Sequence, residues 1–220
     1  MRLTMDQRNM IARRAAKEIV PGMAVNLGIG IPELVADFIP NEWHVMFHSV
    51  NGILGVGPTP IQGEEDQHIS NAGGAPVTIV PGASYFDSTV AYGMIRRRKL
   101  DVAFIGALQV NRRGDLANWI VPGTRVHGIG GGAELAFYAK KVIVLMSHVT
   151  LSGEPKIRRE CTFPLTAKGC VDLIVTERAV IEVTPEGLML TEVMYPYSLQ
   201  DVIYHTGAPL LISEHLQMVE

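Results

Sequence analysis

The sequence predicts an α/β protein with an open, mostly parallel sheet flanked by helices and with an antiparallel edge toward the C-terminus. Short apolar runs alternate with stretches of helical period as far as Leu145, which is typical of strands joined by crossover helices. From Val171 onward, short apolar runs follow one another with only a turn between them. Glycine (22) and proline (13) are spread over the 220 residues, so we expect residues 1–220 to form a single domain.

The N-terminal segment predicts a helix followed by a buried strand. Thr4-Met5-Asp6-Gln7 has the pattern of a capping box, and apolar residues then recur at helical spacing from Ile11 to Val20. Pro21-Gly22 ends this helix. The apolar run 23–27 predicts a strand, which a glycine turn connects to a helix that begins near Pro32.

The middle of the chain continues the alternation of strand and helix. A helix is predicted at 84–98 because its apolar residues gather on one face. The basic run from Arg96 to Lys99 at its end suits the negative end of the helix dipole. A short helix is expected at 134–139. Strands are expected at residues 45–47, 77–80, 102–105 and 142–145.

The C-terminal part predicts the antiparallel edge of the sheet. Short apolar segments at 171–175, 179–183 and 188–190 read as strands, and Thr184-Pro185-Glu186-Gly187 reads as the turn between the last two. A final helix is expected at 198–205 with Ser198 as its cap. The last dozen residues give no firm signal.

The composition argues against several classes of protein. A net charge of −3 and a pI near 6.2 disfavour a nucleic-acid binder, which needs clustered positive charge. No apolar segment suits a secretion signal or a membrane span, so a cytoplasmic protein is expected. Cys161 and Cys170 fit neither a disulfide framework nor a C-x-x-C pair. The seven histidines show no paired-ligand pattern, so no metal site is expected.

Glycine clusters follow several of the predicted strands. Gly28-x-Gly30 and Gly128-x-Gly130 are tight turns whose backbone N–H groups can hold an anion or a developing oxyanion. The first lacks the third glycine of G-x-G-x-x-G, which disfavours a nicotinamide-binding turn. Residues 51–58 predict a further glycine-rich loop. Taken alone, each cluster is explained as well by sharp turns and close packing.

Six short blocks occur in a fixed order along the chain: Asn26–Pro32 (NLGIGIP), Ser49–Gly55 (SVNGILG), Asn71–Gly74 (NAGG), Leu116–Trp119 (LANW), Gly128–Gly131 (GIGG) and Pro164–Thr166 (PLT). Together they resemble the β subunit of family I coenzyme A transferases, and most closely the succinyl-CoA:3-oxoacid and acetate/acetoacetate enzymes. The resemblance runs from about the first helix to the last, and the overall length agrees.

The resemblance implies an obligate α subunit of similar fold, with the active site between the two subunits. In this family the glutamate of an S-E-N-G sequence attacks the acyl-CoA carbonyl, giving an acyl-glutamyl anhydride and then a glutamyl-CoA thioester. The resemblance assigns an oxyanion-hole N–H to Gly130. Coenzyme A esters are then substrates, and no cofactor is bound permanently. The contacts to substrate or coenzyme A fall on Gly28, Gly30, Asn51, Gly52, Asn71, Gly73, Gly74, Gly128 and Gly131.

The sequence departs from the family pattern at the nucleophile, where it reads Ser49-Val50-Asn51-Gly52. Valine has no lone pair with which to attack a thioester, and neither Ser49 nor Asn51 can form the same carboxyl intermediates. The nearest acidic residues in sequence, Glu42 and Glu64, have no place at the attack point in the family pattern. We therefore expect the usual transfer activity to be lost or altered.

Three explanations of Val50 stay open at this point. It can be an engineered replacement that traps a substrate complex, a natural subunit that binds acyl-CoA or regulates its partner without turnover, or a sequence error or an enzyme with another nucleophile. A sugar-phosphate isomerase-like enzyme is a further alternative, since that family is similar in fold and uses glycine loops for phosphate.

The exchanged acids also stay open. Succinate with acetoacetate, acetate with acetoacetate, and butyrate with acetate all fit the sequence. So do one αβ pair and a dimer of such pairs.

Overall fold

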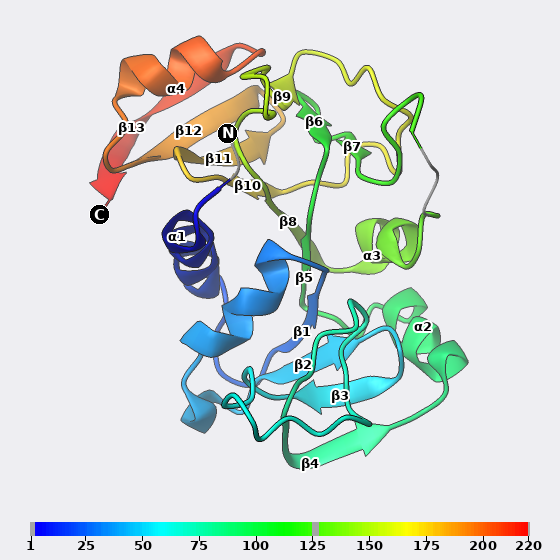
Figure 1. Ribbon diagram of the computed structural model, residues 1–220. Coiled ribbons are helices and arrows are strands. Elements are labelled where there is room, and N and C mark those ends of the chain that lie inside the picture. Colours follow the sequence, from blue (N-terminus) through cyan, green and yellow to red (C-terminus); the bar gives the residue numbers. More distant parts are fainter. Residues whose placement is uncertain (1–2, 125–127, 220) are drawn as a thin grey trace.

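The computed structural model describes residues 3–124 and 128–219. Most strands belong to one ten-stranded sheet (Figure 1). In spatial order the strands of this sheet are β13 (Leu210–Val219), β12 (Gly187–Met194), β11 (Ala179–Thr184), β10 (Leu173–Val175), β8 (Lys141–Leu145), β5 (Val102–Ile105), β1 (Ala24–Leu27), β2 (Met46–Ser49), β3 (Ile53–Val56) and β4 (Ile79–Tyr85).

The centre of this sheet is parallel and both of its sides are mixed. The five strands from β10 to β2 run parallel to one another. On one side β3 and β4 are antiparallel to their neighbours. On the other side β11 and β12 are antiparallel, and β13 joins β12 in parallel. The predicted fold class is confirmed, with antiparallel strands at both edges rather than at the C-terminal edge alone.

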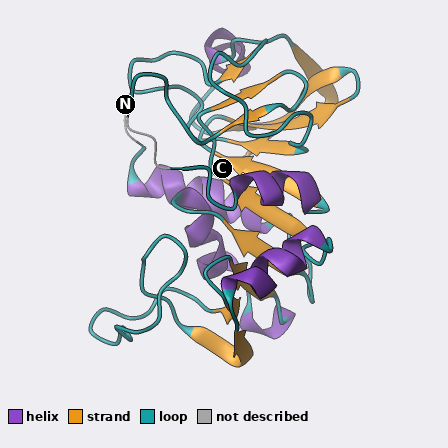
Figure 2. Ribbon diagram, turned by 90° about the vertical axis from the view of Figure 1, so that its right-hand side faces the viewer, coloured by secondary structure: helices purple, strands orange, loops and turns teal. Residues whose placement is uncertain are grey.

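Helices cover both faces of the sheet (Figure 2). The helices are α1 (Met5–Ala16), η1 (Ile31–Phe38), η2 (Asn41–Trp43), α2 (Ser88–Arg96), α3 (Gly132–Tyr138) and α4 (Leu199–His205). Residues of α1 and η1 belong to one hydrophobic cluster, and residues of α2, α3 and α4 belong to another. Because successive side chains of a strand point to opposite faces, β5 supplies Val102 and Phe104 to the first cluster and Ala103 and Ile105 to the second.

Two helix caps predicted from the sequence are confirmed. The Thr4 hydroxyl accepts a hydrogen bond from the Gln7 N–H at 3.2 Å, and the Gln7 side chain accepts one from the Thr4 N–H at 3.0 Å. Ser198 and Asp201 form the same reciprocal pair at the start of α4. These bonds satisfy N–H groups that the first turn of a helix leaves without an acceptor, and so they fix where each helix begins.

The predicted helix at 84–98 is wrong at its start. Residues 79–85 form β4, in which Tyr85 pairs with Ile53 of β3, and the helix α2 begins only at Ser88. Asp87 is the cap, because its carboxylate accepts a hydrogen bond from the Thr89 N–H at 2.7 Å. The strand expected at 77–80 therefore lies further along the chain.

Other strands were not predicted at all. The glycine-rich loop expected at 51–58 contains β3, and the segment without a firm signal contains β13. A separate three-stranded sheet consists of β6 (Gln109–Asn111), β7 (Leu116–Ala117) and β9 (Ile157–Arg158). These strands are short or lie at an edge, where apolar alternation is weak.

The described residues contain no helix that is long and apolar enough to cross a membrane. Over the same residues, no group of three or more histidine, cysteine, aspartate or glutamate side chains could hold a metal ion.

Candidate active site

A cavity of about 530 Å³ opens at the carboxyl ends of β1, β2 and β5. This is the edge of an open α/β sheet where ligands usually bind. We call it the Val50 cavity. The residues that line it are Asn26, Leu27, Gly28, Ile29, Val50, Ala72, Ile105, Gly106, Ala107, Leu108, Asn118, Gly128, Ile129, Gly130, Gly131, Gly132 and Leu135.

Val50 lies in the tight turn that joins β2 to β3. The Gly52 N–H closes this turn by donating to the Ser49 carbonyl at 3.0 Å. Gly52 has a φ of +112°, and a Cβ atom there would overlap the carbonyl oxygen of Phe86. Only glycine fits this position without strain. The turn therefore holds Val50 in a fixed place at the end of β2.

The glycine segment before α3 reaches the Val50 side chain. A Cβ atom placed on Gly131 would lie 3.2 Å from Val50 Cγ1 and 3.2 Å from the Tyr92 hydroxyl. Gly130, with a φ of +53°, borders open space. Within the described part of the chain, the N–H groups of Gly130 and Gly131 have no backbone acceptor. Two N–H donors are thus available beside Val50, the arrangement that stabilises a developing oxyanion.

The Asn71 loop forms another wall of the Val50 cavity. The Asn71 Oδ1 atom accepts hydrogen bonds from the N–H groups of Gly73 at 2.9 Å and Ala75 at 3.0 Å. The Ala72 N–H donates to Ser49 Oγ at 3.1 Å, which joins this loop to the end of β2. The loop therefore places Ala72 against the cavity.

Two further contacts hold this loop in place. Asn51 Nδ2 donates to the Ser70 carbonyl at 2.8 Å. On the other side, Gly73 lies directly against the Glu33 carboxylate, which accepts from the Gly30 N–H at 3.0 Å. Glu33 faces a smaller cavity of about 230 Å³ and does not line the Val50 cavity.

The structure brings five of the eleven predicted site residues into one cavity: Gly28, Val50, Gly128, Gly130 and Gly131. The other six lie in the turns that shape its walls and do not line it: Gly30, Asn51, Gly52, Asn71, Gly73 and Gly74. Direct contact of these six with a coenzyme A ester stays a prediction.

Two asparagines in the Val50 cavity were not among the predicted site residues. Asn26 is 1% exposed, and its Nδ2 donates to the His48 carbonyl at 2.9 Å and lies 3.0 Å from His48 Nδ1. Asn118 Oδ1 accepts from the Thr166 hydroxyl at 2.7 Å. An asparagine inside an apolar strand was the available signal for Asn26, because a buried amide must find partners.

No residue that lines the Val50 cavity in the described part of the chain can replace a carboxylate nucleophile. Its only polar side chains are the two asparagine amides, and Glu42 and Glu64 lie elsewhere. The cysteines are also unsuited, since burial raises the pKa of Cys161 to about 11 and that of Cys170 to about 12. Both thiols are therefore protonated at neutral pH and are poor nucleophiles.

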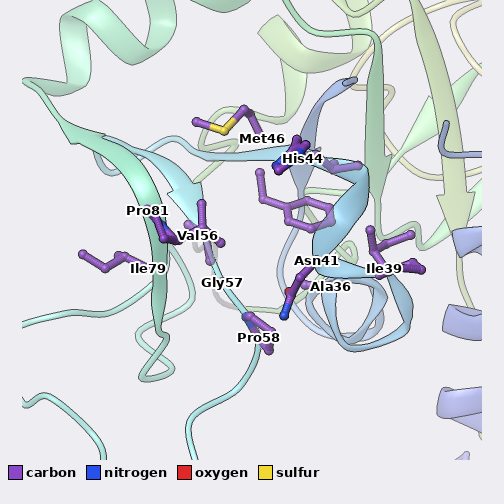
Figure 3. Close-up of a pocket in the computed structure, with 14 residues that line it drawn as sticks. Ala36, Ile39, Asn41, His44, Met46, Val56, Gly57, Pro58, Ile79 and Pro81 are labelled. Atoms are coloured by element: carbon purple, nitrogen blue, oxygen red, sulfur yellow. The ribbon is translucent and has the colours of Figure 1, made fainter. Parts of the chain in front are cut away.

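A separate apolar cavity of about 540 Å³ lies between η1, β2, β3 and β4 (Figure 3). Asn41 and His44 are the only polar side chains among the described residues that line it. It shares no lining residue with the Val50 cavity. It therefore offers no acid, base or nucleophile to the chemistry at Val50.

His48, which holds the Asn26 amide, should make the fold sensitive to acid. Burial lowers the pKa of His48 to about 4, so the folded protein favours the neutral ring. The unfolded chain binds the proton at the ordinary pKa of about 6.5, so stability falls as the pH drops from 6.5 toward 4. We expect His48 alone to cost about 2 kcal/mol between pH 7 and pH 5.

Urea unfolding of the wild type and of His48→Gln at these two pH values measures this contribution. The variant should lose less stability on acidification than the wild type, while His68→Gln, which removes an exposed histidine, should behave like the wild type. An equal pH dependence in all three proteins would show that His48 is not responsible.

Comparison with known proteins places these observations in context. Residues 8–206 match the family described as Coenzyme A transferase. The chain is 53% identical over 212 residues to the β subunit of a probable coenzyme A transferase of Bacillus subtilis (strain 168), covering 96% of this chain and 98% of that protein. It is 44% identical over 201 residues to the B-type subunit of the succinyl-CoA:3-ketoacid coenzyme A transferase of Helicobacter pylori (strain ATCC 700392 / 26695), covering 91% and 97%.

Among solved structures, the apoenzyme of the acyl-CoA transferase YdiF from Escherichia coli O157:H7 superposes with a TM-score of 0.79 at 23% identity. The match covers 100% of this chain and 44% of YdiF, so this chain spans less than half of that protein. At this identity the similarity shows the fold alone.

Proposed function

Since this chain belongs to the coenzyme A transferase family, we propose that it is the β subunit of an enzyme that moves coenzyme A between a short-chain acyl-CoA and a 3-oxo acid. The partner is an α subunit, since the Bacillus subtilis relative is itself the β subunit of a probable transferase. The usual transfer proceeds through a glutamyl-CoA thioester, and Val50 replaces the glutamate that forms it. This chain then binds the acyl-CoA without turning it over by this route.

The observation that supports this proposal most is the approach of Val50 to the glycine segment. A thioester carbonyl carbon next to residue 50 would have its oxygen within reach of the Gly130 and Gly131 N–H groups. These donors stabilise the negative charge that develops on that oxygen when a nucleophile attacks. The donors and the fixed turn are present, and only the attacking carboxylate is missing.

A second candidate function is a noncatalytic acyl-CoA-binding or regulatory subunit. The specific observation that favours it is the lack of any replacement nucleophile among the described residues that line the Val50 cavity. The isomerase-like alternative loses its support, because the family match covers residues 8–206.

Binding of acetoacetyl-CoA to the complex of this chain with its α subunit tests the proposal. We expect saturable binding by calorimetry and no acyl transfer. Gly131→Val should weaken binding about tenfold or more, because the added side chain fills the space against Val50 and Tyr92. Gly93→Val is the matched control, since a Cβ atom on Gly93 meets nothing within 4 Å.

Two results would count against this proposal. Failure of the complex to bind any coenzyme A ester would refute the assigned function. Equal weakening by both valine substitutions would refute the assigned location.

A further inference from the structure

A second cavity adjoins the Val50 cavity on the other side of the loop that follows β5. Its volume is about 700 Å³, and the two cavities share Ile29 and residues 106–108. Most of its wall is apolar and includes Leu145 at the end of β8. We call it the lysine cavity because Lys156 lines it.

The charge of the lysine cavity is positive. Arg8 and Lys156 line it, and no carboxylate does so in the described part of the chain. The Val50 cavity, by contrast, has no charged side chain among its described residues. A chain with a net charge of −3 thus places two cations beside its candidate active site. Such local charge favours an anionic ligand.

Lys156 itself is only weakly satisfied. Its Nζ donates one long hydrogen bond, 3.4 Å, to Ser147 Oγ, and no carboxylate of the described residues lies within 4.0 Å of it. Burial lowers the pKa of Lys156 to about 8, although the charge of Glu177 acts in the opposite direction. The ammonium group is therefore mostly charged at neutral pH in a site that solvates it poorly, and an anion would stabilise it.

We propose that the lysine cavity is the subsite for the distal carboxylate of a dicarboxylic acyl group, with Lys156 as the residue that selects it. The inference rests on the proposed function, which places the thioester in the Val50 cavity. The acyl chain then passes Ile29 and Ala107 into the lysine cavity, where the apolar wall contacts its methylene groups. A coenzyme A phosphate is the other possible anion, but this apolar wall suits a short carbon chain better than a strongly hydrated diphosphate.

Binding of two acyl-CoA esters to the complex with the α subunit tests this subsite. Succinyl-CoA and butyryl-CoA have the same number of acyl carbons, and only the first carries a distal carboxylate. We expect the wild type to bind succinyl-CoA about tenfold or more tightly than butyryl-CoA, as a charge-assisted hydrogen bond predicts. Lys156→Met should abolish this preference and leave butyryl-CoA binding unchanged.

Two further variants separate the role of Lys156 from a loss of structure. Lys99→Met removes an exposed lysine that lines neither cavity and should keep the preference. Lys156→Arg keeps the charge and should retain a preference for succinyl-CoA.

Each remaining outcome bears on one part of the inference. Equal weakening of both esters by Lys156→Met would overturn it in favour of a contact with coenzyme A or a structural role. A preference that survives in Lys156→Met would also overturn it. Failure of the wild type to bind either ester would instead refute the proposed function.

Discussion

Replacing Val50 with glutamate raises the rate of coenzyme A transfer by about 10³-fold or more, when the variant is assayed with its α subunit and a panel of acyl-CoA donors and carboxylate acceptors. The expected gain is large because removing a covalent nucleophile usually costs several orders of magnitude in rate. The remaining parts are in place, since Gly131 lies against residue 50 and two N–H donors are available beside it.

Val50→Gln is the matched control for this gain. Glutamine has nearly the size and polarity of glutamate, but its amide does not form the anhydride, so its rate should stay at the level of the wild type. Activity of both variants, or of the unmodified chain, would show that the carboxylate at residue 50 is not the missing group.

The same reversion should lower the stability of the fold. Val50 is partly buried and packs against the hydrophobic cluster that contains α2 and α3. Placing a carboxylate there without a partner costs about 1–3 kcal/mol. We therefore expect a lower thermal midpoint for Val50→Glu than for the wild type, and a smaller decrease for Val50→Gln. A midpoint above that of the wild type would show that residue 50 is solvated in the assembled site.

Gly52→Ala should cost about 3 kcal/mol or more in the free energy of unfolding. Two effects add at this position, because the φ of +112° is unfavourable for alanine and the new Cβ atom would overlap the Phe86 carbonyl. The turn that holds Val50 must then move, so binding of acyl-CoA should also weaken. Urea unfolding and calorimetry measure these two consequences.

Gly22→Ala separates the two effects. Gly22 has a φ of +82°, but a Cβ atom there meets nothing within 4 Å, so the substitution introduces backbone strain without overlap. We expect it to cost about 1 kcal/mol and to leave acyl-CoA binding unchanged. Equal costs at Gly22 and Gly52 would show that the close approach of Phe86 does not matter.

The parallel centre of the fold could be predicted because its sequence signals are local. Buried strands such as β5 are continuously apolar, and Thr4 and Ser198 mark the starts of their helices with reciprocal hydrogen bonds. The edges could not be predicted in this way. β13 is exposed along most of its length, so its residues show no apolar alternation, and only its pairing with β12 makes it a strand.

The candidate site was predictable to the extent that strand ends coincide with glycine turns. Gly28 and Gly130 are 102 positions apart in the numbering, yet they line one cavity because parallel strands end at the same edge of the sheet. The roles of Asn26 and Asn118 could not be read from the sequence, since each depends on a distant partner, His48 or Thr166. Lys156 was missed for the same reason, because only the fold places it beside the Val50 cavity.

The most direct test of the account is a search for a covalent intermediate by mass spectrometry. The complex with Val50→Glu is incubated with acyl-CoA, quenched in acid, and digested to locate any added mass. The account predicts coenzyme A attached to the peptide that contains residue 50 in Val50→Glu, and no adduct in the wild type or in Val50→Gln. A coenzyme A adduct on any other residue of the wild-type chain, or transfer activity in Val50→Glu without an adduct at residue 50, would contradict it.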